Sequence, residues 1–257
     1  MRALQIVELT GPQSALRLVE VPEPEPSHML TPGAGVVVEV HAAGVSFPEV
    51  LQTRGEYQVK PPLPFVPGSE VAGIVRSSAE GSAFAPGDRV AAFCMLGGFA
   101  ELAVAPEFLT FALPDALDFA QGAGLILNYH TAYFALVTRG RLAAGETVLV
   151  HGAAGGVGTA SLQVAKGLGA RTIAVVSTSV VPTGKMVVDT SVRFPELEDA
   201  LAAVNGQTRA GDNVFLDAQA LSERLFDDHM PANMIAMGAA FQRGALPVSS
   251  TSMEAAV

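Results

Sequence analysis

The chain has 257 residues, of which 49% are hydrophobic and 16% charged, so it carries enough apolar side chains for a sizeable core. Its formal net charge of −10 argues against nucleic acid or an anionic membrane as the main partner, because neither attracts an acidic surface. The single cysteine, Cys94, excludes an intrachain disulfide and a zinc site built from several cysteines. The N-terminal stretch carries Glu8 and does not resemble a secretory signal, and no apolar run approaches the ~20 residues of a membrane span. We therefore expect a cytoplasmic protein that binds neither nucleic acid nor membrane.

The first part of the chain predicts a β-rich domain, which we place at residues 1–122. Short segments rich in β-branched residues are bounded by glycine or proline turns, as is typical of strands. The strands are expected at 35–45, 69–77, 88–94 and 99–105. We expect these strands to be mostly antiparallel, with few helices between them.

The second part, residues 123–257, alternates helical patterns with short buried strands. Helical spacing covers 118–140, with a break near its glycines, and further helices are expected at 159–169 and 195–206. Continuous apolar runs predict strands at 146–152, 171–178, 213–218 and 234–240. This alternation predicts an α/β domain in which crossover helices connect the strands of a parallel sheet.

The stretch 148–170, VLVHGAAGGVGTASLQVAKGLGA, combines a strand, a glycine-rich turn and a helix. In a dinucleotide-binding turn, glycines let the backbone bend sharply and approach a pyrophosphate, which the N-terminus of the helix then binds. The first glycine slot of the strict GxGxxG motif holds alanine, so the surrounding strand and helix support the assignment, and a turn without a ligand is the alternative. The predicted cofactor contacts in this turn are Gly152, Ala154, Gly155, Gly156, Val157 and Gly158.

The end of the second predicted strand bears on which nucleotide binds. NAD-selecting proteins place an acidic residue there, which takes the ribose hydroxyls. This strand ends in VVSTS (175–179), and no carboxylate follows in the chain until Asp189. Small hydroxyl residues leave room for a 2′-phosphate and can donate hydrogen bonds to it, so the sequence favours NADPH over NADH; an ordinary polar loop is the alternative. The predicted contacts to the 2′-phosphate are Ser177, Thr178, Ser179 and Lys185.

Several stretches resemble the zinc-independent quinone oxidoreductases of the medium-chain dehydrogenase/reductase superfamily. The resemblance is dense over residues 1–178 and continues more loosely to about residue 250. It is carried by AAGVSFPEVLQTRGEY (42–57), PPLPFVPGSEVAGIV (61–75), GDRVAAF (87–93), GGFAELAV (97–104), NYHTAYFAL (128–136) and the glycine-rich stretch. It implies a β-rich GroES-like catalytic domain and a Rossmann-type doubly wound parallel sheet, incomplete at its C-terminus, with substrate and nicotinamide in the cleft between the two lobes.

The same comparison bears on metal. Zinc-dependent relatives carry a cysteine where this chain has Ser46, and a His-Glu pair where it has Ser69 and Glu70. A catalytic zinc needs three nitrogen, sulfur or carboxylate ligands, and serine removes two of them. Cys94 is expected to be a small buried hydrophobe, and no pair of histidines has ligand spacing. We therefore expect no metal.

The resemblance implies that hydride passes from NADPH to a quinone or a related conjugated carbonyl. It places Asn128 and Thr131 beside the nicotinamide ribose, and Ser46 and Tyr57 in the substrate cleft, with Tyr57 as the candidate catalytic residue. Ser46 stands where quinone reductases usually have asparagine. Two further cofactor contacts are expected at Ala218 and Gly238.

Three alternatives to this function remain open. An enoyl-thioester reductase on the same fold would use Tyr57 as its proton donor. A homologue could bind the nucleotide without turnover because its catalytic lobe is incomplete. A purely structural role is the weakest alternative.

The sequence also departs from the family in two places. Only six residues, 179–184, separate the second strand from the apolar segment 185–192, which is shorter than a parallel crossover requires. The chain ends at Val257, before the strands and helix with which the family completes its sheet and its catalytic lobe. The predicted strand at 234–240 then has an open, uncharged edge, on the side that carries the dimer contact in the family. We expect a second copy of the chain or a rearranged segment to cover that edge, or the protein to be prone to associate.

Overall fold

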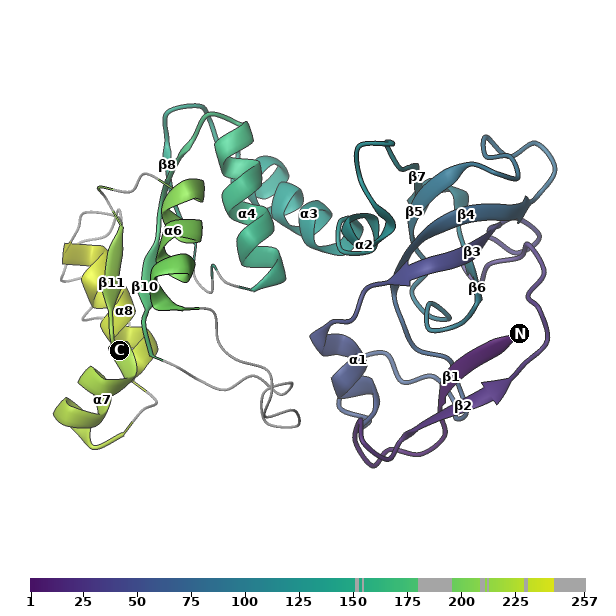
Figure 1. Ribbon diagram of the computed structural model, residues 1–257, viewed down its shortest axis with the longest axis horizontal. Helices are drawn as coiled ribbons and strands as arrows, with labels where there is room; N and C mark the ends of the chain where they lie inside the picture. The colour runs from purple at the N-terminus through teal and green to yellow at the C-terminus, as the bar shows by residue number, and fades with distance from the viewer. Residues whose placement is uncertain are drawn as a thin grey trace. The chain divides into compact units, whose positions relative to one another are not determined.

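The structure is a computed structural model that describes residues 1–150, 153, 155–179, 196–208, 211, 213–228 and 231–242. The chain forms two compact units, Met1–His130 and Thr131–Val257. Figure 1 shows the elements of both units. Among the helices of the described residues, none combines the length and the apolar character that crossing a membrane would require.

The first unit is built on a five-stranded sheet in the order β6-β3-β4-β5-β7, with every neighbouring pair antiparallel (Figure 1). Its strands are β3 (Val36–Ala43), β4 (Glu70–Ser78), β5 (Arg89–Phe93), β6 (Leu102–Ala105) and β7 (Thr110–Ala112). The four strands predicted for this region are confirmed, and β7 is an addition to them. Small β-branched side chains explain the sheet, since they suit a pleated surface buried on the core side.

Valine and alanine fill the core of this sheet. Val36, Val38 and Val90 are all completely buried, and each buried valine stabilises the fold by about 1.5–3 kcal/mol relative to an exposed one. Cys94 belongs to the same cluster and is 1% exposed, as the sequence predicted for a small buried hydrophobe.

The ladder between β3 and β4 contains a bulge. The register passes from Val40 opposite Gly73 directly to Ala42 opposite Ala72, so that His41 has no partner in the ladder. A Cβ atom on Gly73 would overlap the carbonyl oxygen of Glu39, so only glycine lets the two backbones approach this closely.

Short elements surround the sheet. Strands β1 (Arg2–Ile6) and β2 (Leu16–Glu20) form a separate antiparallel pair, and α1 (Phe47–Gln52) follows β3 directly. Like β7, the elements β1, β2 and α1 are additions to the predicted ones. Strand β2 has no buried residue, and Leu18, which shares a face with Leu16, is 67% exposed.

The predicted helical stretch at 118–140 is confirmed, with its break. It consists of α2 (Phe119–Ala123), α3 (Ile126–Tyr133) and one π-helical segment, Phe134–Arg139, labelled η2. Asp118 caps α2 by accepting a hydrogen bond from the backbone N–H of Gln121. Gly124 ends α2 and so separates it from α3.

The second unit contains parallel strand pairs and helices, as predicted for an α/β domain. Strand β8 (Thr147–Leu149) pairs with β9 (Arg171–Ile173), and β10 (Val175–Ser177) pairs with β11 (Val214–Leu216). Ala174 alone separates β9 from β10, so the single strand predicted at 171–178 is present with one interruption. The helices are α4 (Gly156–Gly167), α6 (Leu197–Gln207), α7 (Ala218–Phe226) and α8 (Ala232–Gln242).

The strand predicted at 234–240 is wrong, because these residues lie within helix α8. A continuous apolar run fits a buried helix as well as a buried strand, and the alanine and methionine residues of MIAMGAA favour a helix. The open strand edge that we expected there, and the dimer contact through it, therefore have no basis in the fold. Gly238 lies inside α8 rather than at the end of a strand.

Two other predictions concern residues outside the described part of the chain. The apolar segment 185–192 lies there, together with almost all of the link 179–184 and the predicted phosphate ligand Lys185.

Helix α7 was not predicted at all, although it begins directly after β11.

Candidate functional site

The glycine-rich turn leads from β8 into α4 within the second unit. The N-cap of α4 is Gly155, in an extended conformation with φ −78° and ψ 167°, and its carbonyl accepts a 2.8 Å hydrogen bond from the N–H of Thr159. Gly155, Gly156 and Val157 are exposed, whereas Gly158 is buried. The predicted contacts Gly152 and Ala154 lie outside the described residues.

These features of the turn fit a pyrophosphate. Helix α4 has twelve residues, and its N-cap glycine has no side chain with which to cap the first N–H groups. No acidic residue lies in the first turn of α4, so the positive end of the helix dipole is not offset there. The hydroxyl of Thr159 donates to the carbonyl of Ala153 at 3.2 Å, which ties the turn to the helix. Exposed N–H groups and a helix dipole make such a terminus suitable for an anion.

A second group of predicted residues lies where β10 ends beside β11. Ser177 pairs with Leu216 in the parallel ladder, and the N–H of Thr178 donates to the carbonyl of Leu216 at 2.8 Å. Ser179 Oγ donates to Asp217 Oδ1 at 2.6 Å. The sequence has no carboxylate close after this strand, but the folded structure brings Asp217 to its end. The expectation that no carboxylate lies near the end of the strand is therefore wrong.

The hydroxyl protons of this group point toward the carboxylate. Ser179 has one hydroxyl proton, and it donates this proton in the hydrogen bond to Asp217. The oxygens of Ser177 and Ser179 are 2.7 Å apart, so Ser177 must be the donor of that bond. The result is a chain of hydrogen bonds that runs from Ser177 through Ser179 to Asp217.

Helix α7 begins at this group and supplies it with N–H donors. The N–H of Ala218 donates to Ser177 Oγ at 3.2 Å, and the N–H of Gln219 donates to Ser179 Oγ at 3.1 Å. Asp217 is the N-cap of α7 and accepts from the N–H of Ala220 at 2.9 Å. The bonds from Ser179 and Ala220 lower the pKa of Asp217, so its carboxylate is ionised at neutral pH.

The first unit holds a polar cluster around the buried carboxylate of Glu49, which is 4% exposed. Glu49 Oε2 accepts from the backbone N–H of Ser46 at 2.9 Å and from the Ser46 hydroxyl at 2.6 Å. Its other oxygen, Oε1, accepts from the hydroxyl of Ser69. Ser46 and Glu49 form the capping box of α1, so the same carboxylate joins that helix to the segment before β4.

A second buried carboxylate, Glu70, lies close to this cluster. Its Oε2 accepts from the backbone N–H of Leu127 at 2.8 Å, which joins β4 to α3. Burial raises the pKa of Glu70, and the nearby charge of Glu49 raises it further, whereas the bond from Leu127 acts in the opposite direction. Both serines that stand in place of zinc ligands are thus engaged by Glu49.

Cys94 shows no sign of a ligand role. Its thiol contacts the carbonyl oxygens of Gly68 and Ser69, and burial raises its pKa to about 12. Within the described residues, no three or more His, Cys, Asp or Glu side chains are grouped so that they could hold a metal ion.

The remaining predicted residues occupy separate places. Tyr57 is half-buried in the segment after α1. Asn128 lies on α3, and its side chain donates to the carbonyl of Gly124 at 3.2 Å. Thr131 lies on the same helix and is exposed. Their assignment to ribose and substrate remains a prediction.

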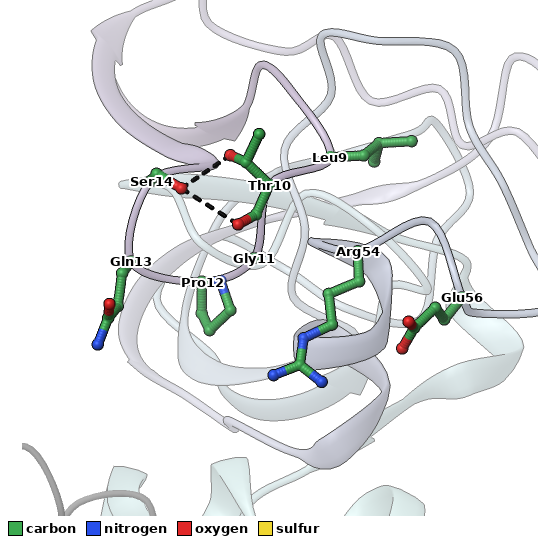
Figure 2. Close-up of a pocket in the computed structure, with 8 residues that line it drawn as sticks. All are labelled: Leu9, Thr10, Gly11, Pro12, Gln13, Ser14, Arg54 and Glu56. Carbon is green, nitrogen blue, oxygen red and sulfur yellow. Dashed lines mark hydrogen bonds between the residues drawn. The ribbon is translucent and has the colours of Figure 1, made fainter.

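A hollow on the first unit contains none of the predicted residues (Figure 2). It has a volume of roughly 600 Å³ and is lined by Leu9, Thr10, Gly11, Pro12, Gln13, Ser14, Arg54 and Glu56. Figure 2 shows Ser14 bonded to Thr10, so the hydroxyl of Ser14 is used inside the loop that forms one wall.

Glu49 and Asp217 are not among the residues predicted from the sequence. The pattern Ser46-x-x-Glu49 before an apolar segment is a capping-box signature and would have indicated the first. Asp217 stands at the junction of a buried strand and ALSERLF, an amphipathic pattern whose helix went unpredicted, and this position is typical of an N-cap.

Comparisons with known proteins agree with this architecture. Residues 32–115 match the family model described as "Alcohol dehydrogenase GroES-like domain". The rat protein named quinone oxidoreductase is 46% identical over 178 residues, which are 67% of this chain and 52% of that protein. A probable oxidoreductase from Mycobacterium abscessus is 46% identical, with a TM-score of 0.62 over 80% of this chain and 66% of that one.

A further solved relative carries a nucleotide. The quinone oxidoreductase of Thermus thermophilus, solved alone and in complex with NADPH, is 28% identical and has a TM-score of 0.62. That comparison covers 92% of this chain and 70% of the Thermus chain. The chain spans about half the length of the curated relatives that it matches. With its GroES-like antiparallel sheet and its partial parallel α/β part, it belongs to the quinone oxidoreductase family of the medium-chain dehydrogenase/reductase superfamily.

Proposed function

We propose that the chain is a zinc-independent oxidoreductase that uses a nicotinamide dinucleotide to reduce quinones or related conjugated carbonyls. The observation that carries this proposal is the start of α4, where an exposed glycine is the N-cap of a helix that follows the parallel strand β8 in the chain of a member of this family. A helix terminus of this kind binds phosphate through backbone N–H groups and the helix dipole.

The bound nucleotide would supply the hydride, and the residues of the chain would bind and orient the reactants. The first N–H groups of α4, at Gly156 and Val157, would hold the pyrophosphate. Asn128 and Thr131 would contact the nicotinamide ribose, and Tyr57 would donate a hydrogen bond to an oxygen of the acceptor. A quinone that has received hydride is a stabilised oxyanion and can take its proton from water, so no acidic side chain is required. Orientation in a site that excludes water is then the main contribution of the protein.

The choice between NADPH and NADH is a separate question. NADPH is the nucleotide of the Thermus relative, and the sequence of this chain favours it. However, two of the hydroxyls on which that preference rests are already engaged as donors, since Ser177 donates to Ser179 and Ser179 donates to Asp217. The binding experiment must therefore include both nucleotides.

The test measures the dissociation constants of NADPH and NADH with the full chain, followed by turnover with a simple quinone. We expect the better nucleotide to bind and to be oxidised by the quinone. Gly156→Val should weaken its binding more than tenfold, because a β-branched side chain fills the space against the phosphates. Gly167→Val is the matched control, since it changes the last residue of the same helix, where an added Cβ would meet open space.

Two outcomes would contradict the proposal. Unchanged nucleotide affinity in a folded Gly156→Val variant would remove the assignment of the turn. Tight nucleotide binding without oxidation by any of a panel of quinones and enones would favour a nucleotide-binding homologue without turnover.

A further inference from the structure

We propose that Asp217 reads the adenosine ribose of the bound nucleotide and selects dinucleotides that lack a 2′-phosphate. This inference rests on the proposed function, because it takes the second unit to be the dinucleotide-binding part. It reverses the preference that the sequence alone indicates, and it assigns the reversal to one side chain.

The position of Asp217 fits this role. Strands β10 and β11 are parallel and paired, so their carboxyl ends lie at the same edge. Ligands of open α/β sheets bind outside that edge, and the residue that recognises the ribose stands at the end of the second strand. Here β10 ends at Ser177, and Asp217 comes directly after β11 and reaches Ser179 across the gap. The carboxylate thus comes from the neighbouring strand rather than from the second strand itself.

The direction of the hydrogen bonds excludes the serines as phosphate donors. Ser177 donates to Ser179, and Ser179 donates to Asp217, so each hydroxyl proton is used inside the group. A phosphate has only acceptor oxygens at neutral pH and would find no free O–H on either serine without breaking this chain of bonds. The first N–H groups of α7, which could otherwise bind an anion, are also taken by Ser177, Ser179 and Asp217.

The negative charge of Asp217 also disfavours a 2′-phosphate. Asp217 is ionised at neutral pH, and a 2′-phosphate would bring up to about two negative charges close to it. No lysine or arginine of the described residues makes a hydrogen bond or an ion pair with Asp217, Ser177 or Ser179. An unphosphorylated ribose, by contrast, offers hydroxyl donors. Both bonds that Asp217 accepts from the described residues go to Oδ1, and we propose that the ribose hydroxyls donate to Oδ2.

The experiment compares NADH and NADPH by calorimetry, and ADP-ribose with its 2′-phosphorylated form as probes without nicotinamide. We expect the parent chain to bind the unphosphorylated member of each pair at least tenfold more tightly. Asp217→Asn should remove most of that difference, because asparagine can still cap α7 but carries no charge. The control is Asp227→Asn at the other end of α7, where the left-handed backbone (φ 54°) accepts asparagine readily. It should leave the ratio unchanged.

The outcomes separate this inference from the proposed function. Tight binding of NADPH in preference to NADH by the parent chain would overturn the inference and leave the proposed function intact. An unchanged ratio in Asp217→Asn would also overturn it. If neither nucleotide bound, the proposed function would fail, and the inference with it.

Discussion

Replacing Glu49 tests whether its carboxylate holds the region around Ser46 together. Glu49→Ala removes the acceptor for three hydrogen bonds, two of them from Ser46 and one from the buried hydroxyl of Ser69. A donor that loses a charged partner in a buried site costs about 1.5–3 kcal/mol, which applies to Ser69. Loss of the capping box of α1 adds about 1–2 kcal/mol. This part stays limited because Ser46 is half-buried, so water can accept hydrogen bonds from its freed N–H and hydroxyl groups. The total loss of unfolding free energy is therefore about 2.5–5 kcal/mol.

The assay is urea unfolding followed by far-UV circular dichroism, since the chain has no tryptophan to report by fluorescence. Glu49→Gln should lose only about 1–2 kcal/mol, because its amide oxygen still accepts from Ser46 and its amide group can donate to Ser69. Glu56→Ala, an exposed glutamate beyond the end of α1, is the control and should change stability by about 0.5 kcal/mol or less. A Glu49→Ala variant within about 1 kcal/mol of the parent would refute the reasoning.

Two further predictions concern neighbours of this cluster. Folding raises the pKa of Glu70, so the folded chain keeps the Glu70 proton at a pH where the unfolded chain has lost it. The contribution of Glu70 to the free energy of unfolding therefore falls as the pH rises from about 4.5 through the raised pKa of the folded chain. Glu70→Gln should remove this part of the pH dependence, so thermal midpoints measured across that range should fall less steeply with pH than in the parent; parallel curves would contradict this. Cys94 is buried and its pKa is raised to about 12, so it should not react with a thiol reagent at about pH 8 in the folded chain. It should react readily once the chain is unfolded in urea. Rapid labelling of the folded protein would contradict this prediction.

Local patterns predicted much of the fold. The runs at β3 and β4 are rich in β-branched residues, alternate in part and are bounded by turn residues, so they were predicted as strands. The strand, turn and helix at 148–170 were identified for the same reason, because each residue type agrees with one local structure. The segment at 234–240 failed because it is apolar at every position, and an unbroken apolar run has no period that distinguishes a helix from a strand.

The candidate site was harder to predict because its contacts join distant residues. Ser179 and Asp217 are 38 positions apart, and only the pairing of β10 with β11 brings them together. Ser69 and Glu49 likewise meet across separate elements. A sequence shows only which side chains follow one another along the chain. No carboxylate follows β10 closely in the sequence, but the pairing of β10 with β11 brings Asp217 next to the end of β10 in the folded structure.

The bulge beside Gly73 has a consequence for how β3 finds β4 during folding. A strand that slips by one residue turns every side chain to the opposite face, and two valine-rich strands offer little local penalty against such a slip. At this ladder, a slip would place Ala72 or Ile74 where Gly73 now lies, and their Cβ atoms would overlap the carbonyl of Glu39. The close approach at a single glycine therefore acts as a steric check on register, rejecting misaligned pairings before the core has closed around them.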